Sequence, residues 1–98
     1  MDYIRIYNQL IENARKKEQS LLSDKNKYYE VHHITPRSMG GDDGPSNMVA
    51  LTYREHFIAH WLLFKIYKNP ETYWAWNQMS LIGENRKKDP YRLSLIHI

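Results

Sequence analysis

Four of the five histidines in this 98-residue chain occur as two close pairs, and these pairs constrain its fold more than any other feature. His32 and His33 are adjacent in a segment of aromatic and β-branched residues, whereas His56 and His60 are four residues apart. Residues four apart lie on one face of a helix, so His56 and His60 can bind the same ion. Neighbouring residues on a strand point to opposite faces, so we expect one of His32 and His33 to bind that ion and the other to serve a different purpose.

The segments around the first pair predict two short strands joined by a long connection. Residues 28–34 are rich in aromatic and β-branched types, and the run stops before Pro36, which cannot donate a hydrogen bond to a neighbouring strand. Residues 37–47 are crowded with glycine, proline, aspartate and asparagine, as is typical of an exposed turn region. Residues 48–51 can then return as a second strand and form a hairpin.

A capping box predicts the start of the helix that carries the second pair. The Thr52 hydroxyl can accept from the backbone at Glu55, and the Glu55 carboxylate can accept from the backbone of Thr52. The helix is expected to end near Lys68, because Asn69-Pro70 follows.

Two further helices are predicted on either side of these segments. The first runs from Asp2 to about Glu18 and is followed by a loop over residues 20–27; the third runs from Pro70 to Gly83. Their apolar positions are Ile4, Tyr7, Leu10, Ile11 and Ala14 in the first and Tyr73, Trp74, Trp76, Met79 and Leu81 in the third.

Size and composition exclude several classes of protein. A chain of 98 residues and 11.8 kDa has room for one domain with a modest core, so its chemistry must lie near the surface. It has no cysteine, so any metal needs His, Asp, Glu or Asn ligands. The formal charge of +3 is compatible with a polyanionic partner. No apolar run is long enough for a membrane span, and we expect a soluble intracellular protein.

The last six residues, 93–98, resemble the translation of a sequencing-library adapter and are set aside. If so, the natural protein continues differently beyond about Arg92. The remaining chain divides into an N-terminal helix and loop (1–27), a central segment with both histidine pairs (28–69), and a C-terminal helix with a basic segment (70–92).

A metal site made of His56, His60 and one strand histidine would have only three protein ligands. Such a site leaves coordination positions open, which favours a catalytic over a structural metal site. The neighbouring strand histidine is then a candidate general base, since neutral imidazole can take a proton from water near pH 7. Imidazole ligands suit Zn, Ni, Co or Mn, and Mg is a less natural alternative.

The order Glu-x-His-His, Gly-Gly, Asn and His-x-x-x-His resembles that of the HNH endonucleases. It is carried by residues 29–34, Gly40-Gly41, Asn47 and residues 54–60, within a resemblance that covers about residues 28–68. The order of these residues resembles the three-histidine version in the nuclease domains of bacterial toxins. The surrounding residues are more similar to the small homing-type HNH endonucleases of tailed phages.

The resemblance implies an α+β protein with a small ββα-metal core, a hairpin plus a helix, flanked by an N-terminal and a C-terminal helix. It also implies one divalent ion, Zn, Ni, Mn or Mg, held by His32, His56 and His60. His33 is similar to the general base that activates water.

Five other residues are assigned on the same basis or by their charge. Asn47 matches the central Asn of the motif and is expected to hold the loop by hydrogen bonds to the backbone. Glu30 matches an acidic residue that supports the site through an arginine. Arg37, Arg54 and Lys65 are candidates for contacts with DNA phosphates, Arg37 foremost.

The resemblance implies a metal-dependent endonuclease that hydrolyses double-stranded DNA in the cytoplasm of a bacterium, encoded by a phage or by the host. The alternative is a non-catalytic nucleic-acid-binding module in which the ion only holds the fold. His33 beside His32 favours the enzyme, because a purely structural site has no need of a second histidine there.

Overall fold

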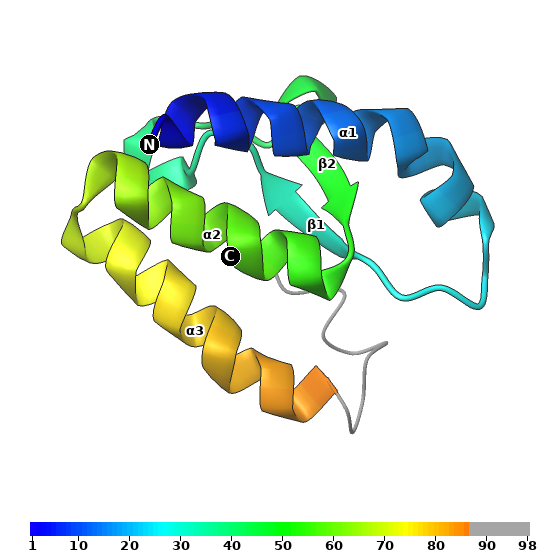
Figure 1. Ribbon diagram of the computed structural model, residues 1–98. Helices are drawn as coiled ribbons and strands as arrows, with labels where there is room; N and C mark the ends of the chain where they lie inside the picture. Colours follow the sequence, from blue (N-terminus) through cyan, green and yellow to red (C-terminus); the bar gives the residue numbers. More distant parts are fainter. Residues whose placement is uncertain (87–98) are drawn as a thin grey trace.

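The structure, a computed structural model, describes residues 1–86, the last six of them by their backbone only. Its order is two strands and a helix between two flanking helices, which confirms the predicted α+β class with a hairpin-plus-helix core (Figure 1). The elements are α1 (Tyr3–Ser23), β1 (Glu30–His33), the short 3-10 turns η1 (Arg37–Met39) and η2 (Pro45–Asn47), β2 (Met48–Leu51), α2 (Tyr53–Tyr67) and α3 (Pro70–Arg86).

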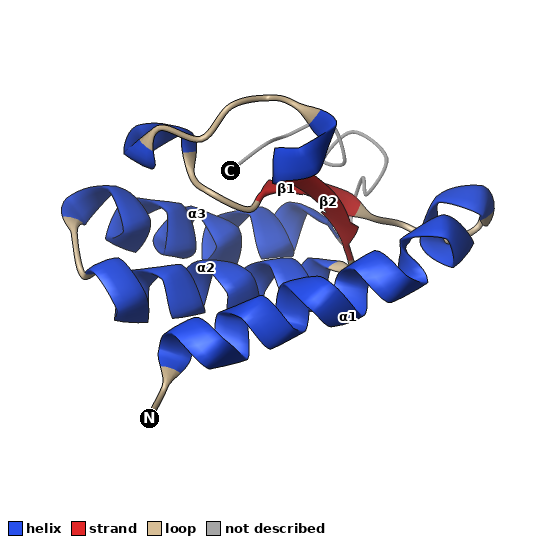
Figure 2. Cartoon of the chain, turned by 90° about the horizontal axis from the view of Figure 1, so that it is seen from above, coloured by secondary structure: helices blue, strands red, loops and turns tan. Residues whose placement is uncertain are grey.

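The three helices form one layer with α2 in the middle, and the hairpin and its long connection lie above them (Figure 2). β1 and β2 pair antiparallel, with Glu30 opposite Leu51 and His33 opposite Met48. Because side chains alternate along a strand, Glu30 and His32 share one face of the hairpin and His33 belongs to the other.

Helix α1 begins as predicted but ends later. The side chain of Asp2 accepts from the backbone N–H of Arg5 at 3.0 Å, as an N-cap does. The helix then runs to Ser23, through residues 20–23 that were expected to form a loop. Leu21 and Leu22 favour helix, and the turn begins only at Lys25, after the extended Asp24, whose side chain accepts from the N–H of Asn26 at 2.9 Å.

The C-terminal half of α1 is bound to the hairpin by polar contacts. Arg15 donates to the carbonyls of Pro45 and Ser46 at 3.3 and 3.0 Å. The Glu18 carboxylate accepts from the N–H of Ala50 at 2.8 Å. These contacts hold α1 against β2 and against η2, the turn that directly precedes β2.

The capping box of α2 is confirmed. The Thr52 hydroxyl accepts from the N–H of Glu55 at 3.2 Å, and the Glu55 carboxylate accepts from the N–H of Thr52 at 3.0 Å. The helix ends at Tyr67, with Lys68 in the left-handed conformation at φ 53°. Helix α3, in contrast, continues past Gly83 to Arg86; a glycine inside a helix costs about 1 kcal/mol relative to alanine and does not by itself end it.

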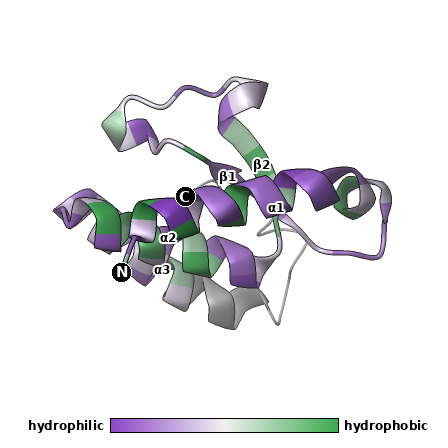
Figure 3. Ribbon diagram, turned by 45° about the horizontal axis from the view of Figure 1, so that its top comes forward, coloured by the Kyte–Doolittle hydropathy of each residue, from purple (hydrophilic) through white to green (hydrophobic). Residues whose placement is uncertain are grey.

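The core lies where α1, β2 and α2 meet, and it is built from eight buried residues: Tyr7, Ile11, Ala14, Val49, Leu51, Ala59, Leu62 and Leu63. Three residues expected on apolar faces are exposed instead: Ile4 (58%), Tyr73 (52%) and Trp74 (62%). Figure 3 shows hydrophobic and hydrophilic bands alternating along α1. Helix α3 packs mainly against α2, and two of its apolar residues, Tyr73 and Trp74, remain exposed.

None of the helices in residues 1–86 is long and apolar enough to cross a membrane. The division into segments 1–27, 28–69 and 70–92 remains a prediction. The adapter-like residues 93–98 lie outside the described residues.

Candidate metal centre

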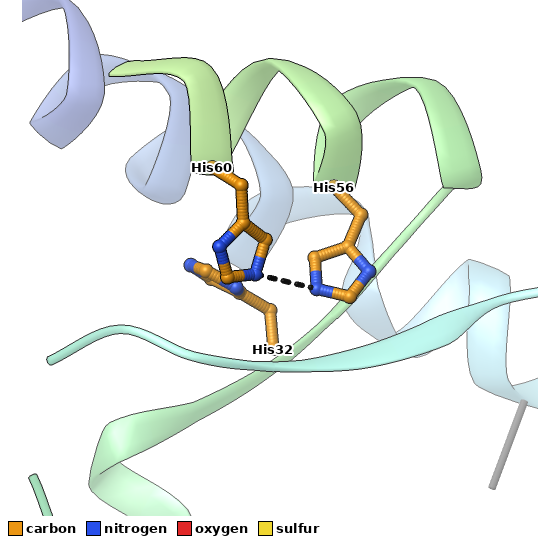
Figure 4. A group of neighbouring side chains, drawn as sticks. All are labelled: His32, His56 and His60. Carbon is orange, nitrogen blue, oxygen red and sulfur yellow. Dashed lines mark hydrogen bonds between the residues drawn. The ribbon is translucent and has the colours of Figure 1, made fainter. Parts of the chain in front are cut away.

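Three histidine side chains meet between the hairpin and α2. His32 comes from β1, and His56 and His60 come from α2; their rings point toward one another (Figure 4). One ring nitrogen of each lies within 4.8 Å of the corresponding atoms of the other two, and all three residues are at most 3% exposed. Such a group of nitrogen donors can hold one divalent ion.

The ring nitrogens of His56 and His60, the two histidines on α2, lie at the distance expected for two ligands of one metal ion. His56 Nε2 and His60 Nε2 are 3.2 Å apart. Two nitrogens bound to one zinc ion at 2.0–2.1 Å with tetrahedral angles lie about 3.4 Å apart. The i and i+4 positions on α2 therefore put these atoms where a shared ion requires them.

A buried carboxylate orients His56. Glu30 Oε1 lies 2.7 Å from His56 Nδ1, and the side chains are 2% and 1% exposed. A hydrogen bond from Nδ1–H to this carboxylate leaves the lone pair on Nε2, which faces His60. Tyr28 donates its hydroxyl proton to the other oxygen of Glu30. Glu30 thus contacts the cluster directly through a histidine, and its support of the site through an arginine remains a prediction.

A tyrosine from α1 contacts His32 from outside the hairpin. The Tyr7 hydroxyl lies 2.8 Å from His32 Nε2 and 2.6 Å from the carbonyl oxygen of Ile34, to which it donates. His32 Nδ1 is buried and has no hydrogen-bond partner among the described residues. An unpaired polar atom in the interior is costly, so Nδ1 fits a bound ion better than an empty interior.

The His32 ring is neutral near pH 7. Burial, and then the neighbouring imidazoles of His56 and His60, lower the pKa of His32 well below its usual value. A neutral imidazole is the form that binds a metal ion. The chemistry of the donor set therefore fits a divalent cation.

His33 lies outside the cluster and has its own acidic partner. Its Nε2 is 2.8 Å from Asp43 Oδ1, and its side chain is only 4% exposed. Arg37 binds the same oxygen through Nε at 2.9 Å and Nη2 at 2.8 Å. The hydrogen bond from His33, followed by that from Arg37, lowers the pKa of Asp43, so the carboxylate is ionised at neutral pH. An ionised carboxylate only accepts, so His33 donates to Asp43 from a protonated Nε2.

The loop that brings Asp43 to His33 is held by Asn47 and two glycines. Asn47 Oδ1 accepts from the N–H of Thr35 at 2.8 Å, and Nδ2 donates to the carbonyls of Thr35 and Asp42 at 3.0 and 2.8 Å. Gly40 has φ +91°, and a Cβ on Gly41 would overlap the carbonyl of Thr35. Asn47 makes the backbone contacts expected of it, and its importance for activity remains a prediction.

A pocket of about 460 Å³ opens beside the cluster, between η1 and the first turns of α3. His33 and His60 both line it, so it adjoins the three-histidine group and the neighbouring histidine at once. Arg37, Leu63 and the exposed Trp74 also face it. A substrate in this pocket would reach both histidines.

The three cations predicted to contact phosphates lie in different places. Arg37 lines the pocket. Arg54 is exposed two residues before His56, and Lys65 lies over the Trp61 ring at 5.6 Å, five residues after His60. Steps of two and five residues turn about 200° and 140° around a helix, so neither shares the face of the histidines.

The three consecutive basic residues of α1, Arg15, Lys16 and Lys17, make contacts within the protein. Arg15 binds the loop carbonyls, Lys16 lies 3.7 Å from Glu12, and Lys17 lies 3.0 Å from Glu55. The basic residues 86–88 of the C-terminal segment extend beyond the described part of the chain.

Sequence reasoning missed two polar residues at this site, Tyr7 and Asp43. Tyr7 was interpreted only as part of an apolar stripe, and nothing in that stripe marks its hydroxyl. Asp43 carried a weak signal, as a carboxylate in the loop after His33, but its neighbour Asp42 carried the same one. Asp42 instead accepts from the N–H of Gly44 at 2.9 Å.

Comparison with known proteins agrees with this geometry. Residues 14–55 match the family model described as HNH endonuclease. The chain is 48% identical over 88 residues to probable mobile endonuclease D of Enterobacteria phage T4, covering 87% of this chain and 33% of that protein. It is 46% identical over 88 residues to probable mobile endonuclease E of the same phage, covering 90% and 59%. It also matches the type IV methyl-directed restriction enzyme EcoKMcrA of Escherichia coli, 42% identical over 52 residues that cover 53% of this chain and 19% of that enzyme.

No solved structure matches the chain. The chain spans a third of the length of mobile endonuclease D and about three fifths of mobile endonuclease E. The family match, the phage relatives and the three-histidine cluster between a hairpin and a helix lead to one assignment. This chain contains a segment, residues 14–55, that matches the HNH endonuclease family.

Proposed function

We propose that this chain is a metal-dependent nuclease domain that hydrolyses phosphodiester bonds of double-stranded DNA. One divalent ion would be held by His32, His56 and His60. The observation that carries the proposal is the separation of adjacent histidines: His32 belongs to the buried cluster, whereas His33 does not and lines the neighbouring pocket. A site that only stabilised the fold would not need His33 there.

The ion, when bound, would supply a positive charge that stabilises negative charge on a phosphate oxygen and on the leaving 3′ oxygen. Three imidazole ligands suit Zn or Ni best, and the alternatives are the harder cations Mn and Mg. Three protein ligands also leave coordination positions for a phosphate, as in other catalytic sites.

His33 would act as the general base. Its hydrogen bond to Asp43 through Nε2 orients the ring, and Nδ1 would take a proton from the attacking water. Attack forms a bond from the water oxygen to phosphorus and breaks the bond to the 3′ oxygen. The products are a 5′-phosphate and a 3′-hydroxyl, with the 3′ oxygen protonated by solvent.

The pocket supplies the substrate contacts. Arg37 on its wall can neutralise a phosphate next to the scissile one. Trp74 offers an exposed ring to the sugar or base beside that phosphate. Arg54 and Lys65 can contact phosphates only farther along the strand, since they lie off the histidine face.

The relatives named mobile endonucleases belong to a phage, so we place the activity in the cytoplasm of a phage-infected bacterium. Because this chain spans only part of those relatives, further DNA contacts can come from segments that they contain beyond the matched region.

A supercoiled-plasmid nicking assay tests the proposal. The protein is assayed with Mg²⁺, Mn²⁺, Ni²⁺ and Zn²⁺ and with EDTA, beside His33→Asn, which keeps all three cluster histidines. Nicking that needs a metal and falls at least 100-fold in His33→Asn is the expected result. If the metal-loaded, folded protein binds DNA without cutting it, the binding-module alternative is correct.

A further inference from the structure

The hydroxyl of Tyr7 touches the cluster from α1, an element outside the hairpin and the helix that supply the three histidines. We propose that Tyr7 is a positioning residue of the metal centre: it fixes His32 as the tautomer protonated on Nε2 and so directs Nδ1 toward the ion. This inference rests on the proposed three-histidine centre, but its test does not depend on nuclease activity.

Counting protons at the hydroxyl gives the tautomer. Tyr7 has one hydroxyl proton, and the carbonyl of Ile34 at 2.6 Å can only accept it. Toward His32 Nε2, at 2.8 Å, the hydroxyl oxygen must therefore accept. Nε2 then carries a proton, and the lone pair of the neutral ring lies on Nδ1.

The environment leaves this arrangement little freedom. Tyr7 is 6% exposed and His32 is fully buried, so no bulk water replaces either partner. The unpartnered Nδ1 is the atom that the cluster gains as a donor.

The centre therefore has two supports from different elements, β1 and α1. Glu30 accepts from His56 Nδ1 and makes Nε2 the donor, whereas Tyr7 accepts from His32 Nε2 and makes Nδ1 the donor. Such partners of metal-binding histidines fix ring orientation and basicity. Tyr7 lies before residue 14, where the match to the family model begins, so this support comes from outside the matched region.

Packing alone does not explain the hydroxyl. Phenylalanine would fill the same core position beside Ile11 and Ala14 without bringing a polar group that needs partners. The hydroxyl finds two partners here, and one of them is a histidine of the cluster.

The test compares Zn²⁺ affinity in the full chain with the variant Tyr7→Phe, measured by competition with a chromophoric chelator. Removing the hydroxyl should weaken Zn²⁺ binding about 10- to 100-fold. The matched control is Tyr3→Phe, which removes a hydroxyl from the same helix at a partly buried ring packed on Trp61. Its affinity should equal that of the unchanged protein.

Unfolding of the metal-free proteins separates positioning from structure. A loss of affinity in a Tyr7→Phe variant that unfolds at the same denaturant concentration as Tyr3→Phe supports the proposal. Unchanged Zn²⁺ affinity in Tyr7→Phe overturns it, even if the protein nicks DNA. If the unchanged protein binds no metal, both this inference and the proposed centre fail.

Long-range ¹H–¹⁵N spectra of the imidazoles in the Zn²⁺-loaded, unchanged protein give a reading that needs no variant. The expected spectrum shows His32 protonated on Nε2 and His56 protonated on Nδ1. A His32 ring protonated on Nδ1 contradicts the proposal.

Discussion

Glu30 and His56 face each other in the interior, with Glu30 Oε1 2.7 Å from His56 Nδ1 and both side chains at most 2% exposed. The contact joins the first residue of β1 to the first histidine of α2. It sets which nitrogen of His56 faces the cluster, so the strand controls the ligand geometry of the helix.

Replacing Glu30 by Gln tests that control. The amide keeps the size of the side chain but loses the charge that holds the Nδ1 proton, so Zn²⁺ affinity should fall about tenfold or more. Isothermal titration of Zn²⁺ measures it. The control is Glu12→Gln, which removes an exposed carboxylate from α1. Equal affinity in Glu30→Gln and Glu12→Gln would mean that the carboxylate plays no part in the centre.

Gly41 differs from Gly44 in what surrounds it. A Cβ on Gly41 would overlap the backbone oxygen of Thr35 and lie 2.9 Å from Asn47 Nδ2. Gly41→Ala should therefore destabilise the fold by about 3 kcal/mol, measured by urea unfolding. Gly44→Ala meets only the Asp42 side chain, at 3.2 Å, and should cost much less. Equal losses for both would contradict the close approach at Gly41.

The capping box at the start of α2 makes a quantitative prediction. Thr52→Ala removes the hydroxyl that accepts from the N–H of Glu55 and should cost about 1 kcal/mol. For a domain of this size the melting temperature should fall by about 5 °C in a thermal scan. Ser80→Ala, at an exposed position of α3, serves as the control. A Thr52→Ala protein that melts with the control would show that the cap contributes nothing.

Trp74 tests the use of the pocket. Trp74→Ala should reduce plasmid nicking about tenfold through weaker DNA contact, while Zn²⁺ affinity stays the same. The control is Tyr53→Ala, an aromatic residue of similar exposure that does not line the pocket. Loss of nicking in both variants, or in neither, would place the substrate elsewhere.

The main features of the site could be predicted because they depend on local periodicity. The spacing of His56 and His60 places them on one helical face whatever the helix packs against. Alternation along the strand separates His32 from His33, as the structure shows. The capping box fixes where α2 begins and therefore where His56 lies along it.

The missing features depend on how the elements dock. The Tyr7 hydroxyl reaches His32, 25 residues away, only because α1 lies against the hairpin at one particular angle. The same is true of Trp74: apolar spacing in α3 could not reveal that the ring would remain exposed. Which of Asp42 and Asp43 turns to His33 depends on the loop conformation set by Asn47 and Gly41.

The central claim is that three histidines hold one ion and that the fourth stands beside it. Anomalous X-ray diffraction from crystals of the Zn²⁺-loaded protein tests this most directly. The account predicts one strong zinc peak per chain in this cluster, about 2.0–2.1 Å from His32 Nδ1, His56 Nε2 and His60 Nε2, with His33 not coordinated. A peak coordinated by His33, or no peak at the cluster, would contradict it.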